Sequence, residues 1–407
     1  MRRAPGAALR DTGRVRRLLP IYALIFVAEV LLQAFIPLTP TFTEQFSLSK
    51  VEAGALLAAA SLSSVVVSIP AGLLADRIGA RRVTVAAALL LAISGVGQGL
   101  AGGFWLLLAS RGSFGVAFGM IWTAGLAWLS DSAPPARRAG ALAACMTVAG
   151  AGAVAGPTFA GVLADRFGVA SPFVIAAVAS AVILAVLLRI EPGHAAEHER
   201  TDLLAAARAA GRDRWILGGV AIMGFAGIVA SAVNLLVPLR LGENGLSATT
   251  IGLAFSGAAC VFTILSAGLA RLGTRAVSAK AAGAAVLFLG AALVLPVVSM
   301  STPALVGFVL LRTPAFAVLF TIVYPLGAAG AHRAGIGRGA VMAFLNVAWG
   351  AATLIGPLLG GALAQTVGER FTYALLMGSC LVVGAFVLGA LARRPARDEA
   401  PAPIASG

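Results

Sequence analysis

The chain has 407 residues, of which 59% are hydrophobic and 11% are charged, and its mean hydropathy is +0.96. Because soluble domains carry roughly a quarter charged residues, this composition excludes a soluble globular protein and indicates a polytopic membrane protein. The formal net charge of +14 could also indicate a protein that binds nucleic acid. The positions of the basic residues along the chain decide between nucleic-acid binding and membrane topology as the reason for this charge.

Twelve apolar runs are long enough to cross the hydrocarbon of a bilayer, which takes about 20 residues each. Backbone groups find no water in lipid, so we expect each run to be a helix. The first run is too long for the core of a signal peptide and is therefore interpreted as an uncleaved helix. The runs are 18–40, 53–74, 83–101, 104–130, 139–163, 171–190, 215–239, 247–270, 277–299, 302–329, 338–364 and 370–392.

Basic residues alternate strongly between the segments that connect these runs. If the N-terminus lies inside, the inner segments hold 24 of the 30 basic residues and the outer loops hold four, namely Lys50, Arg166, Arg240 and Arg370. This asymmetry is what the positive-inside rule produces. The sequence therefore predicts a multi-pass protein of the cell membrane with both termini in the cytoplasm, and a nucleic-acid partner becomes unnecessary.

The two halves of the chain resemble each other at an offset near 200 residues. The matched pairs are Gln33 with Asn234, Pro37 with Pro238, Arg111 with Arg312, Arg138 with Arg338, and Gly156-Pro157 with Gly356-Pro357. We expect an N-terminal tail (1–17), a six-helix bundle (18–190), a cytoplasmic linker with a short helix capped by Thr201 and Asp202 (191–214), a second bundle (215–392) and a C-terminal tail (393–407). A duplicated six-helix unit is an architecture of secondary transporters, which bind substrate near the midplane between the halves.

The stretch AGLLADRIGARR (71–82) resembles the signature of the major facilitator superfamily, Gly-x-x-x-Asp-Arg-x-Gly-Arg-Arg. The matching residues are Gly72, Asp76, Arg77, Gly79, Arg81 and Arg82, while Ala80 stands where a basic residue is usual. The resemblance implies an all-α fold of twelve transmembrane helices in two pseudo-symmetric six-helix bundles.

Physically, the first glycine of this stretch would let a neighbouring helix approach and the second would allow a tight turn. Asp76 can pair with Arg77 or Arg81 and can interact with the N-terminal end of a facing helix. We expect a latch on the cytoplasmic side, to which Asp131 at the end of the fourth helix also belongs. The alternative is a basic loop that only obeys topology.

Three ionisable side chains, Glu29, Arg111 and Arg312, lie well inside the apolar runs, where a charge is costly and usually functional. Glu29 lies roughly 16 Å along the first helix at about 1.5 Å per residue. A carboxyl there can bind and release a proton as water access changes, and it attracts cations. Arg111 resembles the family's fourth-helix arginine, which is implicated in proton coupling. The alternatives are structural hydrogen bonds, a permanent Glu29–Arg111 ion pair, and, for Arg312, an anionic substrate group or a mirror of the duplication.

The fifth helix resembles the antiporter motif of the superfamily, Gly-x-x-x-Gly-Pro-x-x-Gly-Gly. The matching residues are Gly152, Gly156, Pro157 and Gly161, and Ala160 replaces one glycine. Glycines permit close helix packing, and Pro157 removes a backbone hydrogen bond and bends the helix. A bend without meaning for transport is the alternative.

The remaining polar and aromatic residues of five helices are candidates for the lining of a substrate cavity: Gln33, Trp122, Asn234, Arg312, Phe316, Tyr324, Asn346 and Trp349. Each could instead be a packing residue or an interfacial anchor. Together, aromatic rings and one carboxyl suit small lipophilic or cationic compounds. The first hypothesis is therefore a proton-coupled, multidrug-type exporter, and the second is an uptake symporter or uniporter for a metabolite.

An enzyme or a primary pump is disfavoured, because no phosphate-binding Gly-x-x-x-x-Gly-Lys-Ser/Thr occurs and no Cys cluster accompanies His194, His198 and His332. We thus expect no catalytic residues, no metal and no cofactor. The expected partners are a small-molecule substrate, protons and the lipid bilayer, and the protein is expected to be a monomer. A receptor or lipid-handling member of the same fold stays a further alternative.

Overall fold

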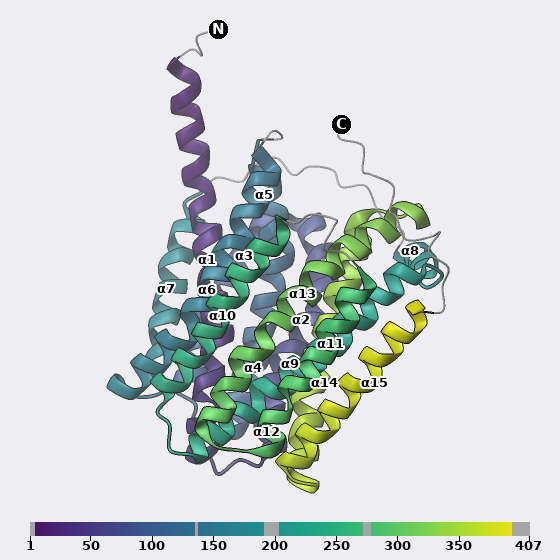
Figure 1. Ribbon diagram of the computed structural model, residues 1–407. Coiled ribbons are helices and arrows are strands. Elements are labelled where there is room, and N and C mark those ends of the chain that lie inside the picture. Colours follow the sequence, from purple (N-terminus) through teal and green to yellow (C-terminus); the bar gives the residue numbers. More distant parts are fainter. Residues whose placement is uncertain (1–4, 135–136, 191–202, 272–277, 393–407) are drawn as a thin grey trace. The chain divides into compact units, whose positions relative to one another are not determined.

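A computed structural model describes residues 5–134, 137–190, 203–271 and 278–392 (Figure 1). Within these ranges the chain forms helices and the loops that connect them. Twelve spans built from these helices are long and apolar enough to cross a membrane, between Leu18–Gln45 at one end of the chain and Glu369–Leu388 at the other. The twelve transmembrane helices predicted from hydropathy are confirmed.

The first six spans comprise seven α-helices and one turn of π-helix. Their bounds are α1 Pro5–Gln45, α2 Lys50–Ile78, α3 Ala80–Gly99, α4 Phe104–Met120, the π-turn η1 Ile121–Gly125, α5 Leu126–Ser132, α6 Arg138–Phe167 and α7 Ser171–Leu188. The fourth span runs without a break through α4, η1 and α5. Local sequence explains several ends: Ser49 and Glu52 form a capping box that starts α2, and Gly168, with φ +86°, ends α6.

The second half begins with the short helix α8. The bounds are α8 Leu203–Ala210, α9 Arg214–Glu243, α10 Ala248–Ala270, α11 Ala279–Ala292, α12 Val294–Val298, α13 Thr302–Ala334, α14 Arg338–Thr366 and α15 Glu369–Ala392. Helix α8 is the short helix expected in the linker, and its expected caps at 201 and 202 lie outside the described residues. The C-terminal tail 393–407 lies outside them as well.

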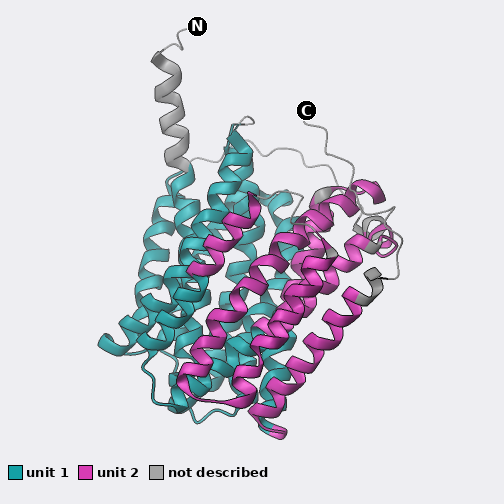
Figure 2. Ribbon diagram, viewed as in Figure 1, with its two compact units in different colours: residues 1–199, 231–259, 353–365 teal, residues 200–230, 260–352, 366–407 magenta. Residues whose placement is uncertain are grey.

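The chain divides into two compact units (Figure 2). Unit 1 contains residues 1–199, 231–259 and 353–365, and unit 2 contains 200–230, 260–352 and 366–407. In unit 1, α1 packs against α6 and α7, α2 packs against α4, and α3 packs against α4 and α7. Parts of α9, α10 and α14 thus belong to unit 1, across the linker at 191–214. The division into bundles 18–190 and 215–392 stays a prediction.

Unit 2 is organised around α11, which packs against both α13 and α15. Helix α8 also contacts α13. Buried side chains of three helices form one of its apolar clusters, made of Met223, Val323 and Leu345. This packing holds the lower-numbered part of α9, together with α13 and α14, in one body.

Candidate functional site

Glu29 lies where α1 crosses α6, and the crossing depends on glycine. A Cβ atom at Gly152 would lie 2.8 Å from the Cβ of Glu29, and one at Gly156 would lie 2.9 Å from the Cβ of Gln33. Carbon atoms do not approach so closely, so a larger residue at either position would push the helices apart. The buried carboxyl and the first two glycines of the antiporter motif, predicted separately, form one site.

Trp122 is the other component of this site. It lies in the π-turn η1, and its indole is directed toward the carboxyl of Glu29. The buried Nε1 makes no hydrogen bond of ordinary geometry with another described residue. Such an unsatisfied donor calls for an explanation, and π-turns occur frequently at functional sites. Two phenylalanines of α4 form an aromatic row with Trp122. The ring centroid of Phe118 lies 6.1 Å from that of Trp122, and the ring centroid of Phe114 lies 5.8 Å from that of Phe118.

Glu29 itself is only 8% exposed, and it forms no ion pair with any described basic residue. The permanent ion pair with Arg111, one of the alternatives that the sequence left open, is therefore not present. A buried carboxyl beside an indole N–H, with no basic partner among the described residues, is a site for a proton, a cation or a hydrogen-bonding ligand.

Arg111 is 2% exposed and satisfies its guanidinium with neutral partners. Its Nε donates to the Leu56 carbonyl at 3.2 Å and its Nη1 donates to Oε1 of Gln98 at 3.4 Å. The guanidinium carbon also lies 4.2 Å from the ring centroid of Phe35 and 5.1 Å from that of Phe114. These contacts join α1, α2, α3 and α4 around one side chain. The sequence did not identify Gln98, although an amide in an apolar run was a visible signal.

The cavity residues expected from the sequence fall into both units. Gln33, Trp122 and Asn234 lie in unit 1, whereas Arg312, Phe316, Tyr324, Asn346 and Trp349 lie in unit 2. The structure brings the first two to Glu29. A single cavity lined by all eight residues stays a prediction.

In unit 2 the aromatic side chains form a cluster of their own. The Phe320 ring lies 5.0 Å from that of Trp349 and 5.8 Å from that of Phe262, both edge to face. Arg312 is 8% exposed, and its guanidinium carbon lies 5.8 Å from the Phe316 ring centroid. Tyr324 and Asn346 are exposed on the surface of the described residues.

The stretch 71–82 forms the turn between α2 and α3. Gly79 has φ +95° and donates its N–H to the Ala75 carbonyl at 2.9 Å, which confirms that the turn needs a glycine. The close helix approach expected at Gly72 is not found, because a Cβ atom there would make an ordinary contact of 3.4 Å with Thr123. A glycine is thus required at the second position and only tolerated at the first.

The charged residues of this stretch have partners that differ from the expected ones. Arg81 donates through Nη2 to the carbonyls of Leu187 and Leu188, at 3.2 and 3.1 Å, and so caps the C-terminal end of α7. It is not paired with Asp76. Asp76 and Arg77 are exposed, and no ion pair of Asp76 occurs among the described residues.

Asp131, the remaining latch candidate, lies half-buried in α5 near its end. The start of the next span is fastened to this helix end, because Nε of Arg138 donates to the Ser130 carbonyl at 2.9 Å. Asp131 thus lies at the end of the fourth span, Phe104–Ser132, and its part in a latch stays a prediction.

The second half of the antiporter motif faces a different helix from the first half. A Cβ atom at Gly161 would overlap the Ala248 carbonyl of α10 and lie 2.8 Å from the Cα of Thr249. In return, a Cβ atom at Gly252 would lie 2.8 Å from the carbonyl carbon of Pro157. Here α6 and α10 touch backbone to backbone.

The duplicate of this contact joins α14 to α2. A Cβ atom at Gly361 would lie 3.0 Å from the carbonyl carbon of Lys50, and one at Gly54 would lie 3.0 Å from that of Pro357. Both contacts lie in unit 1, at the end that carries the loops 46–49, 168–170 and 244–247, which the basic residues predict to be outside. We call it the predicted outer end. The Gly-Pro repeat seen in the sequence thus marks two related helix crossings.

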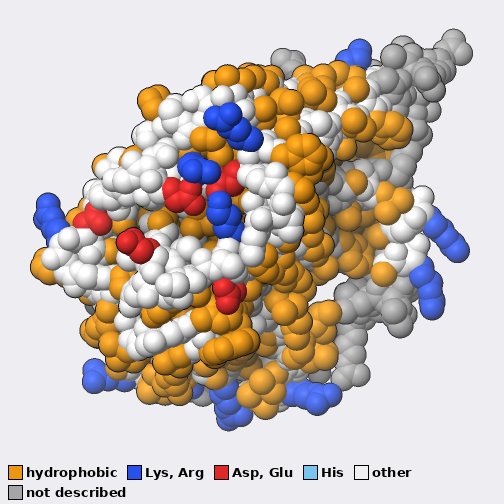
Figure 3. All heavy atoms as spheres, turned by 90° about the horizontal axis from the view of Figure 1, so that it is seen from below, with side chains coloured by type: hydrophobic (Ala, Val, Ile, Leu, Met, Phe, Trp, Pro, Cys, Tyr) orange, Lys and Arg blue, Asp and Glu red, His pale blue; other side chains and the backbone are white. Residues whose placement is uncertain are grey.

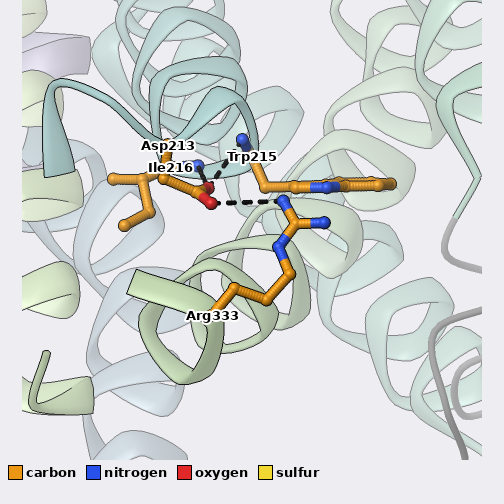
Figure 4. A network of polar contacts seen from close by, with 4 residues as sticks. All are labelled: Asp213, Trp215, Ile216 and Arg333. Atoms are coloured by element: carbon orange, nitrogen blue, oxygen red, sulfur yellow. Dashed lines mark hydrogen bonds and ion pairs between the residues drawn. The ribbon is translucent and has the colours of Figure 1, made fainter. Parts of the chain in front are cut away.

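A polar network in unit 2 was not anticipated (Figure 4). Asp213 Oδ1 accepts the N–H groups of Trp215 and Ile216 at 2.8 and 3.1 Å, and so caps the start of α9. Its Oδ2 forms an ion pair of 3.2 Å with Nη2 of Arg333, near the end of α13. The guanidinium carbon of Arg333 also lies 5.1 Å from the Trp215 ring centroid. The network fastens the end of α13 to the start of α9.

Curated relatives match parts of the chain. "MFS-type transporter ppzB" of Metarhizium rileyi is 28% identical over 186 residues, which is 44% of this chain and 38% of that protein. "Multidrug resistance protein 2" of Bacillus subtilis is 31% identical over 177 residues, which is 42% of this chain and 44% of that protein. The matched segments thus span less than half the length of these relatives.

Solved structures match nearly the whole chain. A bacterial homologue of the human lysosomal transporter Spinster superposes with a TM-score of 0.75 and 18% identity, over 93% of this chain and 97% of that one. A POT family transporter in complex with 5-aminolevulinic acid gives a TM-score of 0.73 and 14% identity, over 92% and 96%. These likenesses show a shared fold.

The sequence profile of the Major Facilitator Superfamily matches residues 19–340. This range includes the turn at Gly79, the buried Arg111 and the whole antiporter-type helix α6. Together with the twelve spans and the shared fold, the match shows that this chain is a multi-pass member of the major facilitator superfamily, a family of secondary transporters and not of enzymes.

Proposed function

We propose that the protein exports small lipophilic or cationic compounds in exchange for protons, by alternating access, with Glu29 as the group that binds proton and substrate in turn. The resemblance of α6 to the antiporter motif supports export, as does the partial match to a multidrug resistance protein. In this proposal the protein acts as a monomer in the cell membrane with both termini in the cytoplasm.

The surroundings of Glu29 carry this proposal. The carboxyl is buried on α1, lies beside the indole N–H of Trp122, and has no basic partner among the described residues. A buried carboxyl without a basic partner is favoured only when it holds a proton or a cation. Alternation between these two ligands is what the exchange of protons for a cationic substrate requires.

The other candidate residues take supporting roles in the proposal. Gly152 and Gly156 hold the main chain of Glu29 against α6, and Arg111 holds α1 in place through Phe35. Asp76, exposed beside the Gly79 turn, is available for the cytoplasmic latch with Arg77 and Asp131 in the state in which that side is closed.

Inverted membrane vesicles with an acidic lumen and an internal pH-sensitive dye test the proposal. When tetraphenylphosphonium is added, exchange carries the cation inward and protons outward, so the lumen of wild-type vesicles becomes more alkaline. Glu29→Gln keeps the size of the side chain, but an amide cannot bind and release a proton. We therefore expect this variant to abolish the response. Glu29→Asp should retain part of it.

Glu44→Gln is the matched control, because Glu44 lies on the same helix but is exposed. It should respond as the wild type does. Equal responses from Glu29→Gln and the wild type would reject Glu29 as the coupling group. Movement of protons and compound in the same direction would instead favour the uptake symporter.

A further inference from the structure

We propose that Asp165 and Gln365 lock the predicted outer end, each by capping the first turn of a helix from the other half of the chain. The lock goes beyond the proposed function and does not depend on Glu29. It concerns how a secondary transporter of this sequence holds one end closed while its substrate site is open to the other side.

The first cap joins α6 to α10. Asp165 Oδ2 accepts the backbone N–H of Thr249 at 2.8 Å, and the carboxylate is also within hydrogen-bonding reach of the Thr249 hydroxyl, the Ser247 hydroxyl and the Ala248 N–H. The first N–H groups of a helix have no partner inside the helix. Ser247, next to the start of α10, accepts only the N–H of Thr250, at 3.3 Å, so Asp165 supplies a negative charge and an acceptor for the N–H groups of Ala248 and Thr249.

The second cap joins α14 to α2 in the same manner. Gln365 Oε1 accepts the backbone N–H of Val51 at 3.4 Å. Ser49 already caps another N–H group of this turn from within α2, through Glu52 N at 3.2 Å. The amide of Gln365 thus binds a donor that the local capping box leaves free.

The register of the duplication relates the two caps. Asp165 and Gln365 are separated by the same number of residues along the chain as Gly161 and Gly361. Each caps a helix at the point where the glycine one turn earlier, in α6 or α14, already touches the backbone of that helix. Two related contacts of the same construction, at the same end, are unlike a chance surface hydrogen bond.

Further polar contacts surround the lock. Lys50 Nζ lies 3.6 Å from Oε1 of Glu243, and Arg240 Nη1 lies 2.7 Å from Oε2 of the same carboxylate. Figure 3 shows acidic and basic side chains gathered on the face seen from below. Further along the same two helices, Thr158 of α6 donates both its N–H and its hydroxyl to Oγ of Ser256 in α10, at 3.1 and 2.8 Å.

Hydrogen bonds of this kind suit a contact that must open and close. When the ends separate, the freed N–H groups and the acceptors face water and can be solvated, so the open state is accessible. The two caps differ in strength, because a charged acceptor at a helix N-terminus binds more strongly than a neutral amide. We therefore expect Asp165 to contribute more to the lock than Gln365.

Accessibility of a reporter thiol tests the lock. Ser256 is 9% exposed beneath the Asp165 cap, and Ser256→Cys places a thiol at the position of its hydroxyl, in a chain whose Cys145, Cys260 and Cys380 are replaced by serine. Intact cells and inverted vesicles are labelled in parallel with a membrane-impermeant maleimide. Loss of a cap by Asp165→Ala should raise the labelling rate roughly fivefold, and Gln365→Ala about twofold.

Two further variants decide what a change in labelling means. Asp165→Asn retains an acceptor oxygen but loses the charge, so its labelling rate should lie between those of the wild type and Asp165→Ala. Arg166→Ala alters the neighbouring exposed residue and should have no effect. Unchanged labelling in both Asp165→Ala and Gln365→Ala would overturn the proposal, and so would an equal rise in Arg166→Ala. If Asp165→Ala does not reach the membrane, Gln365→Ala decides alone.

The side from which the rise is seen reports the topology separately. A rise in intact cells supports an outer position of the loop 244–247, and a rise only in inverted vesicles would place the lock at the inner face. Neither result depends on proton exchange, so a failure of the lock and a failure of the export proposal can be told apart.

Discussion

Gly152 lies directly against Glu29, so closely that a Cβ atom at the glycine would come 2.8 Å from the Cβ of the acid. The same helix face continues to Gly156 and Gln33 one turn further along. The first two glycines of the stretch that resembles an antiporter motif and the acid buried in the first span are therefore two sides of one helix crossing. This crossing gives the candidate coupling site its position.

The first prediction concerns that crossing. Gly152→Ala should force α1 and α6 apart and lower the free energy of unfolding by about 1–3 kcal/mol, the usual cost of overpacking. It should also lower transport, because the carboxyl moves. Thermal unfolding of purified protein in detergent and the vesicle assay measure the two effects. Gly150→Ala is the control. Gly150 lies on the same helix, but a Cβ atom there would have no neighbour within 4 Å. Equal stability and transport in both variants would contradict the crossing.

A second prediction follows from the duplication. Gly161→Ala and Gly361→Ala should destabilise the predicted outer end to a similar extent, about 1–3 kcal/mol each, because each methyl group would meet a backbone carbonyl of the facing helix. Thermal unfolding of the two variants measures the effect. Gly257→Ala, on α10 with no neighbour within 4 Å, should be almost neutral. A large effect at only one of the two sites would mean that the crossings are not equivalent.

The third prediction separates the cap from the ion pair at Asp213. Asp213→Ala should cost about 1–2 kcal/mol, because it removes the cap of α9 together with the ion pair. Asp213→Asn keeps an oxygen for the cap and should cost less. Arg333→Ala should cost below about 1 kcal/mol, because its side chain is 43% exposed and exposed ion pairs contribute little. A double-mutant cycle of Asp213→Ala and Arg333→Ala, followed by thermal unfolding, isolates the pair. A coupling near zero would leave only the cap.

Arg111 gives the fourth prediction. Lysine cannot donate to Leu56 and Gln98 with the spacing of a guanidinium, so Arg111→Lys should lower stability by about 1–3 kcal/mol despite the retained charge. If Arg111 only positions α1, the transport that remains in Arg111→Lys should keep the pH profile of the wild type. A displaced profile would instead assign Arg111 to proton coupling. Gln98→Ala, which removes one partner and keeps the arginine, should weaken stability less.

The sequence by itself determined the class of fold. Twelve spans follow from hydropathy alone, because lipid leaves the backbone of an apolar run no alternative to a helix. The need for glycine in the turn at Gly79 and the burial of Glu29, Arg111 and Arg312 also followed from the sequence. Each of these features depends on a short stretch of chain and on the solvent around it.

Only the tertiary structure decided which residues meet. It turned Gly152 toward Glu29 but Gly161 toward α10, gave Arg81 to the end of α7 in place of Asp76, and brought Asp165 to the first turn of α10. In a soluble helix the polar side reveals which face is buried, but a membrane helix is apolar all round, so its sequence does not fix the face that packs. The face that packs depends on how side chains distant in sequence fit together between helices, and hydropathy carries no information about that fit.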